Sequence, residues 1–180
     1  MAPYKQLDFL SLDDQFSEEE RMVRDTVREW VGDRFLPGIA EHFEAGTVPM
    51  DLVPELADLG VFGPTTPEEY GGAGLNNVAY GLICQELERG DSGLRSFVSV
   101  QGSLVMWPIH EYGSEAQKDE WLPKLASGEA IGCFGLTEPD AGSNPGGMTT
   151  TAVRDGDEWV LNGRKMWITN GTVSQVAVVW

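Results

Sequence analysis

Residues 133–143 read CFGLTEPDAGS and residues 165–171 read KMWITNG, and these two stretches decide the fold. Each stretch reads as an apolar strand that runs into a turn through a threonine, Thr137 in the first and Thr169 in the second. Such a strand end places a hydroxyl and several backbone N–H groups at the point where the turn begins. This arrangement would suit a flat ligand with polar edges.

Helical signals fill the sequence before these stretches. Capping boxes that begin at Ser17 and Ser114 predict the starts of two helices. Pro37 is expected to end the first of these helices and Pro123 the second, because a proline inside a helix removes a hydrogen bond. Apolar residues at helical spacing predict three more helices, around residues 52–59, 78–90 and 92–105.

From residue 130 onward the hydrophobic period changes to that of strands, which we predict over residues 131–136, 148–153, 159–161, 165–169 and 175–180. Asp155-Gly156 and Asn162-Gly163 read as hairpin turns. We therefore predict an α+β fold, with an N-terminal helical-bundle domain over residues 1–129 and the first strands of an antiparallel β domain over residues 130–180. Because the sequence ends within a strand that no turn follows, we expect this β domain to be truncated.

The composition excludes several classes of partner. With 29 acidic and 12 basic residues the formal net charge is −17, which would repel nucleic acid and anionic membrane surfaces. His42, His110, Cys84 and Cys133 lack the spacing of metal ligands, so we expect no metal site. Without a signal sequence or a long apolar run, the chain reads as cytoplasmic, or as a mitochondrial matrix protein whose presequence has been removed.

Residues 134–143 and residues 162–171 together resemble the paired signature of the acyl-CoA dehydrogenases, which are flavoproteins with a helical domain, a β domain and a second helical domain. Residues 59–64, which read LGVFGP, and residues 70–74, which read YGGAG, also fit this family. The resemblance therefore spans nearly the whole chain.

The resemblance implies that FAD is the cofactor and that the two stretches form one wall of its site. Thr137 would lie at the pyrimidine edge of the flavin ring, Trp167 would cover one side of the isoalloxazine, and Thr169 would hydrogen-bond near N5. The residues implied in cofactor binding are Phe134, Gly135, Leu136, Thr137, Trp167, Ile168 and Thr169.

One predicted helix carries a second candidate site. Arg95 and Ser99 lie four residues apart and so project together, although this spacing alone favours a solvated arginine. Residues 86–101 resemble the glutaryl-CoA dehydrogenase branch, in which an arginine and a nearby serine bind the distal carboxylate of the substrate, as suits a guanidinium. Ser143 would touch the pantetheine. The residues implied in substrate binding are Glu88, Arg95, Ser96, Ser99 and Ser143.

The implied activity is FAD-dependent α,β-dehydrogenation of an acyl-CoA thioester, with glutaryl-CoA oxidised and decarboxylated to crotonyl-CoA. The family's base is a glutamate in the C-terminal helical domain, so no catalytic residue is assigned, Glu138 included, and these 180 residues alone are expected to be inactive. The family implies electron-transfer flavoprotein as the acceptor and a homotetramer. Two alternatives stay open, namely a dehydrogenase for another short or branched acyl-CoA and a non-catalytic flavin-binding or assembly fragment.

Overall fold

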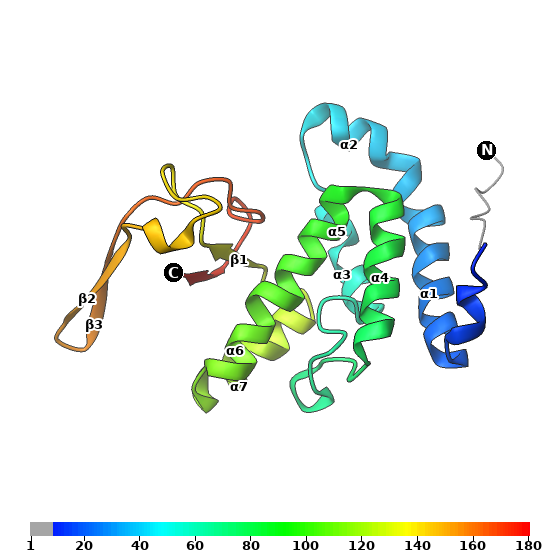
Figure 1. Cartoon of the computed structure of the whole chain (residues 1–180), viewed down its shortest axis with the longest axis horizontal. Helices are drawn as coiled ribbons and strands as arrows, with labels where there is room; N and C mark the ends of the chain where they lie inside the picture. The colour runs from blue at the N-terminus through cyan, green and yellow to red at the C-terminus, as the bar shows by residue number, and fades with distance from the viewer. Residues whose placement is uncertain (1–8) are drawn as a thin grey trace.

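The computed structural model describes residues 9–180, so the first residues of the predicted helical domain, 1–8, lie outside the described residues. Figure 1 shows helices α1–α7 gathered in one body, with strands β1–β4 beside it. This order confirms the predicted helical domain followed by strands. The helices are α1 (Glu18–Trp30), α2 (Ile39–Ala45), α3 (Val53–Asp58), α4 (Asn77–Gly90), α5 (Ser92–Ser99), α6 (Trp107–Tyr112) and α7 (Glu115–Ala126). The strands are β1 (Gly132–Gly135), β2 (Thr151–Asp155), β3 (Glu158–Asn162) and β4 (Val176–Val179).

The helix starts are capped as predicted. Ser17 Oγ accepts from the N–H of Glu20 at 3.1 Å while the Glu20 carboxylate accepts from the N–H of Ser17 at 2.8 Å, which completes a capping box. Ser114 and Gln117 form the same reciprocal pair before α7. The carboxylate of Asp91 caps α5. These contacts satisfy N–H groups that have no partner inside the helix.

The first helix ends before Pro37 as predicted, but the predicted helix end at Pro123 is wrong. After α1 the chain passes through a π-helical segment, Val31–Phe35, and a 3-10 turn, Leu36–Gly38, into α2. Pro37 therefore lies at the start of a turn, where its missing N–H costs little. Pro123 lies inside α7, which continues to Ala126. It is exposed, so water can reach the carbonyl that loses its helical partner.

The hydrophobic core joins the helices. Figure 1 shows α4 between α1 and α5, against both of which it packs. The aromatic rings of Phe62 and Phe97 lie 6.1 Å apart within this core. Burial of such apolar surface is the main term that stabilises the helical body. Fully buried side chains include Val27, Val31, Phe62, Ile83, Leu87, Val98, Met106, Leu122 and Leu125.

A buried amide joins the helical body to the first strand. Gln101 lies in the π-helical segment Val100–Met106 that continues α5, and its side chain is fully buried. Its Nε2 donates to the carbonyls of Leu125 at 2.9 Å and Ala130 at 2.8 Å. Its Oε1 accepts from the N–H of Gly132 at 2.8 Å. This side chain fixes the point at which β1 leaves the helices.

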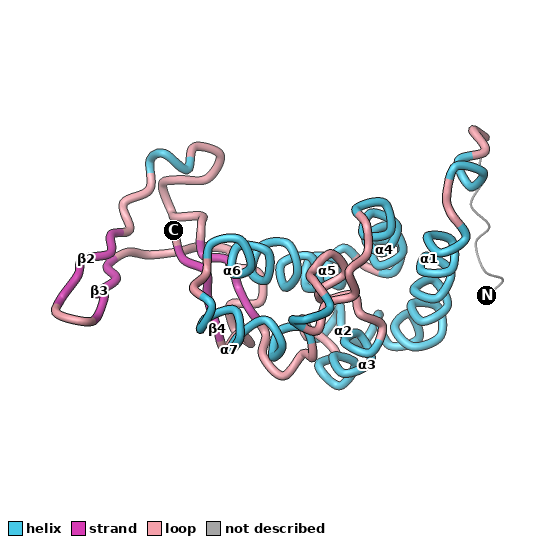
Figure 2. The backbone as a smooth tube through the Cα atoms, turned by 90° about the horizontal axis from the view of Figure 1, so that it is seen from below, coloured by secondary structure: helices cyan, strands magenta, loops and turns pink. Residues whose placement is uncertain are grey.

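The strands form two separate pairs. β2 and β3 run antiparallel around the predicted turn at Asp155-Gly156, and Figure 2 shows this hairpin extending away from the helices. β1 and β4 run parallel, with Gly132 opposite Val176, which corrects the antiparallel arrangement expected for this part of the sheet. A parallel pair requires a long crossover, which residues 136–175 supply.

Two predicted strands need correction. β2 begins at Thr151 rather than at residue 148, because Thr149 and Thr150 bind the carboxylate of Glu138 instead of a neighbouring strand. Residues 165–169 form no strand. Trp167 has a φ of 59°, which lies in the left-handed region and is incompatible with a strand.

The predicted hairpin turn at Asn162-Gly163 is also wrong. β3 ends at Asn162, and no strand follows immediately. A Cβ atom on Gly163 would lie 2.1 Å from Oγ1 of Thr150, so a glycine is needed for close approach rather than for a turn.

Candidate functional site

The two stretches quoted at the outset lie against each other. The N–H of Met166 donates to the carbonyl of Thr137 at 2.8 Å, and the Nζ of Lys165 donates to the carbonyl of Leu136 at 3.1 Å. Backbone atoms of both stretches therefore meet where β1 ends. The structure brings the predicted cofactor residues of the two stretches into one region of the molecule.

The carboxylate of Glu138 holds this region together. It is buried and accepts from the N–H groups of Thr149 at 2.7 Å and Thr150 at 3.0 Å, and also from both threonine hydroxyls. Lys165 donates to it at 2.8 Å. The ammonium of Lys165, followed by these hydrogen bonds, holds the pKa of Glu138 far below its usual range. Such a carboxylate serves as an anchor for this region.

Trp167 and the two threonines present groups that the protein itself does not use. Trp167 is 86% exposed and has a φ of 59°, a conformation that is rare for a bulky residue and occurs in turns and at functional sites. Thr137 is half-buried and Thr169 is exposed. Within residues 9–180, neither threonine hydroxyl makes a hydrogen bond. Both hydroxyls are free to contact a ligand.

The other predicted cofactor residues line the same chain segments. Phe134 is half-buried in β1, and its ring lies 5.9 Å from the ring of Trp180. Gly135 is buried at the end of β1. Leu136 and Ile168 are half-buried beside the threonines that they precede. These residues offer apolar surface next to the free hydroxyls.

Four of the predicted substrate residues form a second cluster, between α4 and α5. Nε of Arg95 donates to Glu88 at 2.7 Å, and Nη1 donates to the hydroxyl of Ser99 at 3.2 Å. The Ser99 hydroxyl in turn donates to the carbonyl of Ser96 at 3.3 Å. Glu88 also accepts from Ser92 at 2.5 Å. The Nη2 of Arg95 makes no hydrogen bond within residues 9–180, so it is open to an acceptor.

Charge is fixed within this cluster. The hydrogen bond to Glu88 raises the pKa of Arg95. The hydrogen bonds from Ser92 and then Arg95 lower the pKa of Glu88. Both side chains are therefore ionised at neutral pH, and the pair as it stands carries no net charge. An anionic ligand on Nη2 would add one negative charge.

Sequence reasoning missed the continuation of this cluster along α4. Tyr80 and Cys84 lie two turns and one turn before Glu88, and burial raises the pKa of both. Cys84 is half-buried and faces Arg95. The four-residue spacing of these residues could have revealed the shared face.

Ser143 does not join the cluster. It is exposed in the loop before the 3-10 turn Pro145–Gly147, and no hydrogen bond links it to Arg95 or Glu88 within residues 9–180. Its predicted contact with the pantetheine stays a prediction.

Asn170 links the two regions, and sequence reasoning missed it. Its Nδ2 donates to the carbonyl of Phe97 in α5 and to the carbonyl of Gly132 in β1, both at 3.2 Å. Its φ is 64°, a left-handed conformation that asparagine tolerates better than most residues. Two left-handed residues within four positions, Trp167 and Asn170, explain why this segment turns instead of forming a strand.

A third polar cluster is structural. Glu86 is fully buried and accepts from Arg28 Nη2 at 2.7 Å and from Arg89 Nε at 2.9 Å. It joins α1 to α4, and neither of its arginine partners is a predicted site residue. A buried carboxylate with two arginine partners needs no ligand to explain it.

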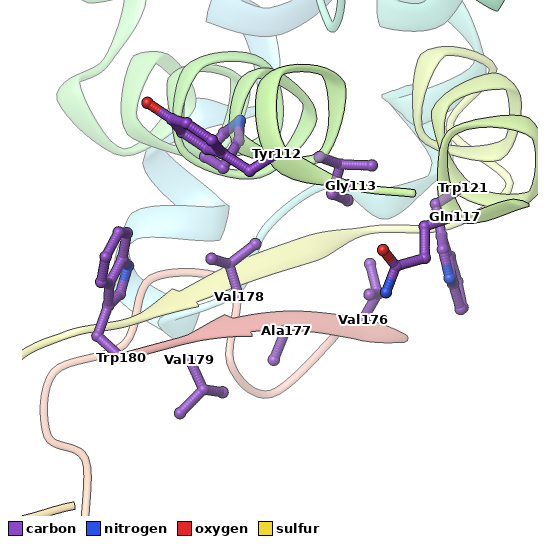
Figure 3. Close-up of a pocket in the computed structure, with 11 residues that line it drawn as sticks. Tyr112, Gly113, Gln117, Trp121, Val176, Ala177, Val178, Val179 and Trp180 are labelled. Atoms are coloured by element: carbon purple, nitrogen blue, oxygen red, sulfur yellow. The ribbon is translucent and has the colours of Figure 1, made fainter. Parts of the chain in front are cut away.

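A cavity of about 620 Å³ lies beside β4, between this strand and the helices α6 and α7. Figure 3 shows Tyr112, Gln117 and Trp121 on one side of it and Val178 and Trp180 on the other. None of the predicted cofactor or substrate residues lines it. The candidate site is therefore the surface formed by the two stretches together with the Arg95 cluster.

Within residues 9–180, no helix is long and apolar enough to cross a membrane, and no cluster of His, Cys, Asp or Glu could hold a metal ion.

Comparison with protein families gives two matches. The acyl-CoA dehydrogenase N-terminal domain matches residues 17–129, and the acyl-CoA dehydrogenase middle domain matches residues 133–180.

Individual proteins extend this result. A crystal structure of a glutaryl-CoA dehydrogenase from Mycobacterium smegmatis in complex with FADH2 is 57% identical, with a TM-score of 0.94 over 97% of this chain and 45% of that one. The probable acyl-CoA dehydrogenase YngJ of Bacillus subtilis is 40% identical over 92% of this chain and 43% of its own. The mitochondrial short-chain specific acyl-CoA dehydrogenase of Rattus norvegicus is 37% identical over 92% of this chain and 40% of its own. The chain thus spans less than half the length of these relatives.

Proposed function

Because the chain belongs to the acyl-CoA dehydrogenase family, we propose that the whole protein catalyses FAD-dependent α,β-dehydrogenation of an acyl-CoA thioester. We propose glutaryl-CoA as the substrate, which would be oxidised and decarboxylated to crotonyl-CoA. The observation that carries the substrate is the unpaired Nη2 of Arg95 beside the Ser99 hydroxyl.

The described residues fit a flavin. The free hydroxyls of Thr137 and Thr169 supply polar contacts, and the exposed ring of Trp167 supplies a flat apolar surface. FAD supplies the redox chemistry in such enzymes, while the protein binds and orients the ring. Glu138 and Lys165 would act indirectly, because they hold Thr137 and the second stretch in place.

The Arg95 cluster fits a substrate that carries a second carboxylate. Arg95 is already oriented by Glu88 and Ser99, so little side-chain freedom is lost when Nη2 binds an anion. A guanidinium that pairs with a carboxylate makes a charge-assisted hydrogen bond, which is stronger than a neutral one. A substrate with a plain acyl chain would not use this charge. The identity to the Mycobacterium smegmatis protein, 57%, supports the same choice.

A second candidate is a dehydrogenase for another short or branched acyl-CoA. The 37% identity to the Rattus norvegicus short-chain enzyme favours it. It predicts that butyryl-CoA is oxidised at least as efficiently as glutaryl-CoA. A non-catalytic flavin-binding or assembly role is the third candidate, for the case in which residues 1–180 act alone.

We also propose the expected context of this activity. We propose a domain boundary between a helical domain over residues 1–129 and a β domain over residues 130–180. We also propose a homotetramer, electron-transfer flavoprotein as the acceptor and a cytoplasmic location. All of these rest on the sequence. The catalytic base is expected outside these 180 residues, in keeping with the short span of the chain relative to its relatives.

The test compares substrates on the whole protein. We expect the protein purified with FAD to reduce an artificial electron acceptor with glutaryl-CoA, to release CO₂ and to prefer glutaryl-CoA to butyryl-CoA. A preference for butyryl-CoA would overturn glutaryl-CoA as the substrate and favour a dehydrogenase for another short or branched acyl-CoA. The chain of residues 1–180 alone is expected to show no turnover with either substrate, and turnover by it would contradict the expected position of the base.

A further inference from the structure

We propose that Asn170 is a positioning residue that sets the substrate-binding part of α5 against the wall of the flavin site. This proposal rests on the proposed function of the two regions. Asn170 lies in the second stretch, but it is not one of the residues implied in cofactor or substrate binding.

The contacts of Asn170 join three separate segments. One side-chain nitrogen donates to Phe97 in α5 and to Gly132 in β1, each at 3.2 Å. Phe97 lies two residues after Arg95 and two before Ser99, so the bond is made within the segment that carries the proposed carboxylate site. β1 leads directly into Thr137. Asn170 itself immediately follows Thr169.

The Phe97 carbonyl lies where the helix changes register. α5 ends at Ser99 and the π-helical segment Val100–Met106 follows, with the N–H of Val100 donating to the carbonyls of both Ser96 and Phe97. A carbonyl oxygen can accept two hydrogen bonds, and Asn170 donates one to Phe97. Interruptions of this kind in a helix often occur at functional sites.

The backbone of Asn170 imposes a second requirement. With a φ of 64°, the position favours glycine or asparagine. Glycine would satisfy the backbone but would leave the Phe97 and Gly132 carbonyls without this donor. Asparagine satisfies both requirements. A substitution by glycine therefore tests the role of the side chain separately from that of the backbone conformation.

Three substitutions in the whole protein with FAD test the role. Asn170→Gly keeps the left-handed backbone and removes the amide. Asn170→Asp keeps the size but places an acceptor against two carbonyls. Asn76→Ala is the matched control, because Asn76 also makes two side-chain hydrogen bonds, to the N–H of Ala79 and to Glu20, each at 2.9 Å, as the cap of α4.

We expect Asn170→Gly to weaken FAD binding, measured by quenching of flavin fluorescence, and to lower kcat/KM for glutaryl-CoA, each by about tenfold, since two neutral hydrogen bonds are lost. Asn170→Asp is expected to lose more than Asn170→Gly. Asn76→Ala is expected to lower the unfolding temperature by about as much as Asn170→Gly does. It is expected to leave FAD affinity and kcat/KM within about twofold of the wild type.

The outcomes separate the two proposals. If the wild-type protein binds FAD and oxidises glutaryl-CoA while Asn170→Gly matches it in both measurements, the positioning role is overturned and the proposed function stands. If Asn170→Gly and Asn76→Ala lose the same fraction of FAD affinity and kcat/KM, Asn170 is only a stabilising residue and the role is again overturned. A wild-type protein that neither binds FAD nor oxidises an acyl-CoA overturns both proposals.

Discussion

The helical body, residues 18–126, and the crossover segment, residues 136–175, are held together by different forces. In the helical body α1, α4 and α5 bury an apolar core that contains nearly every fully buried side chain. The crossover segment has few buried side chains, and both strands of its hairpin are exposed along their whole length. It is fixed by polar side chains, chiefly Glu138 and Asn170.

The two regions also divide the two proposed tasks between them. The helical body presents a charged side chain, Arg95, whose position depends on a rigid helix. The crossover segment presents Trp167 and Thr169 on a loop whose position depends on a small number of hydrogen bonds. Loss of one bond is therefore expected to matter more in the crossover segment than loss of one bond in the helical body.

Removing a leucine side chain from each region is expected to give the largest difference between them. In the chain of residues 1–180, Leu122→Ala should lower the free energy of unfolding by about 3 kcal/mol, because Leu122 is fully buried and leaves a cavity. Leu161→Ala, in exposed β3, should cost less than about 0.5 kcal/mol. Denaturation in urea measures both. Equal costs would show that the crossover segment has a packed core of its own.

Arg95→Ala tests whether selectivity belongs to the helical body. In the whole protein it should lower kcat/KM for glutaryl-CoA by about a hundredfold, because a charge-assisted hydrogen bond is lost, while butyryl-CoA is little affected. Arg95→Lys is the control that keeps the charge but loses the forked geometry, and it should lie between the two. An equal loss on both substrates would contradict a carboxylate-binding role.

Acid should loosen the crossover segment through Glu138. Because the pKa of this carboxylate is lowered in the folded state, it stabilises the fold above the usual glutamate pKa of about 4.3, and this stabilisation is lost as the pH falls below that value. The NMR shifts of the Thr149 and Thr150 amide protons should therefore change at acidic pH. Glu138→Gln should show the same change in these amide shifts already at neutral pH. Glu129→Gln, at an exposed position, should keep the wild-type shifts.

Ser143→Ala is expected to have the smallest effect. Ser143 is exposed and makes no hydrogen bond to the Arg95 cluster, so one solvent-exposed contact with the pantetheine is the most it can lose. We expect KM for glutaryl-CoA to rise about threefold and kcat to stay unchanged. Ser127→Ala, at the end of α7, serves as the control. A large fall in kcat would contradict a role confined to binding.

The helical body could be predicted because its signals are local. The capping partners of Ser17 and Ser114 lie three residues away, within the window that a sequence pattern covers. The prediction that failed in the helical body is the helix end at Pro123. There the outcome depends on whether water can reach the carbonyl that the proline leaves without a partner. The presence of a proline in the sequence does not by itself show whether water can reach that carbonyl.

The candidate site was predictable by residue type but not by contact. Resemblance pointed to Arg95, Thr137 and Thr169, yet Asn170 reaches Phe97 across 73 positions and Lys165 reaches Glu138 across 27. Such contacts have no sequence period. The parallel pairing of β1 with β4 escaped prediction for the same reason, since nothing in either strand specifies the direction of its partner.

The parallel pairing also fixes an order of events during synthesis. Gly132 pairs with Val176, and so β1 leaves the ribosome long before its partner exists. The whole helical body, residues 18–126, is synthesised before β1, so its contacts can form first. Until β4 arrives, the backbone groups of β1 on that side stay unpaired and can bind another extended chain. Slow translation between these two strands would therefore raise the risk of aggregation more than the same delay within the helices.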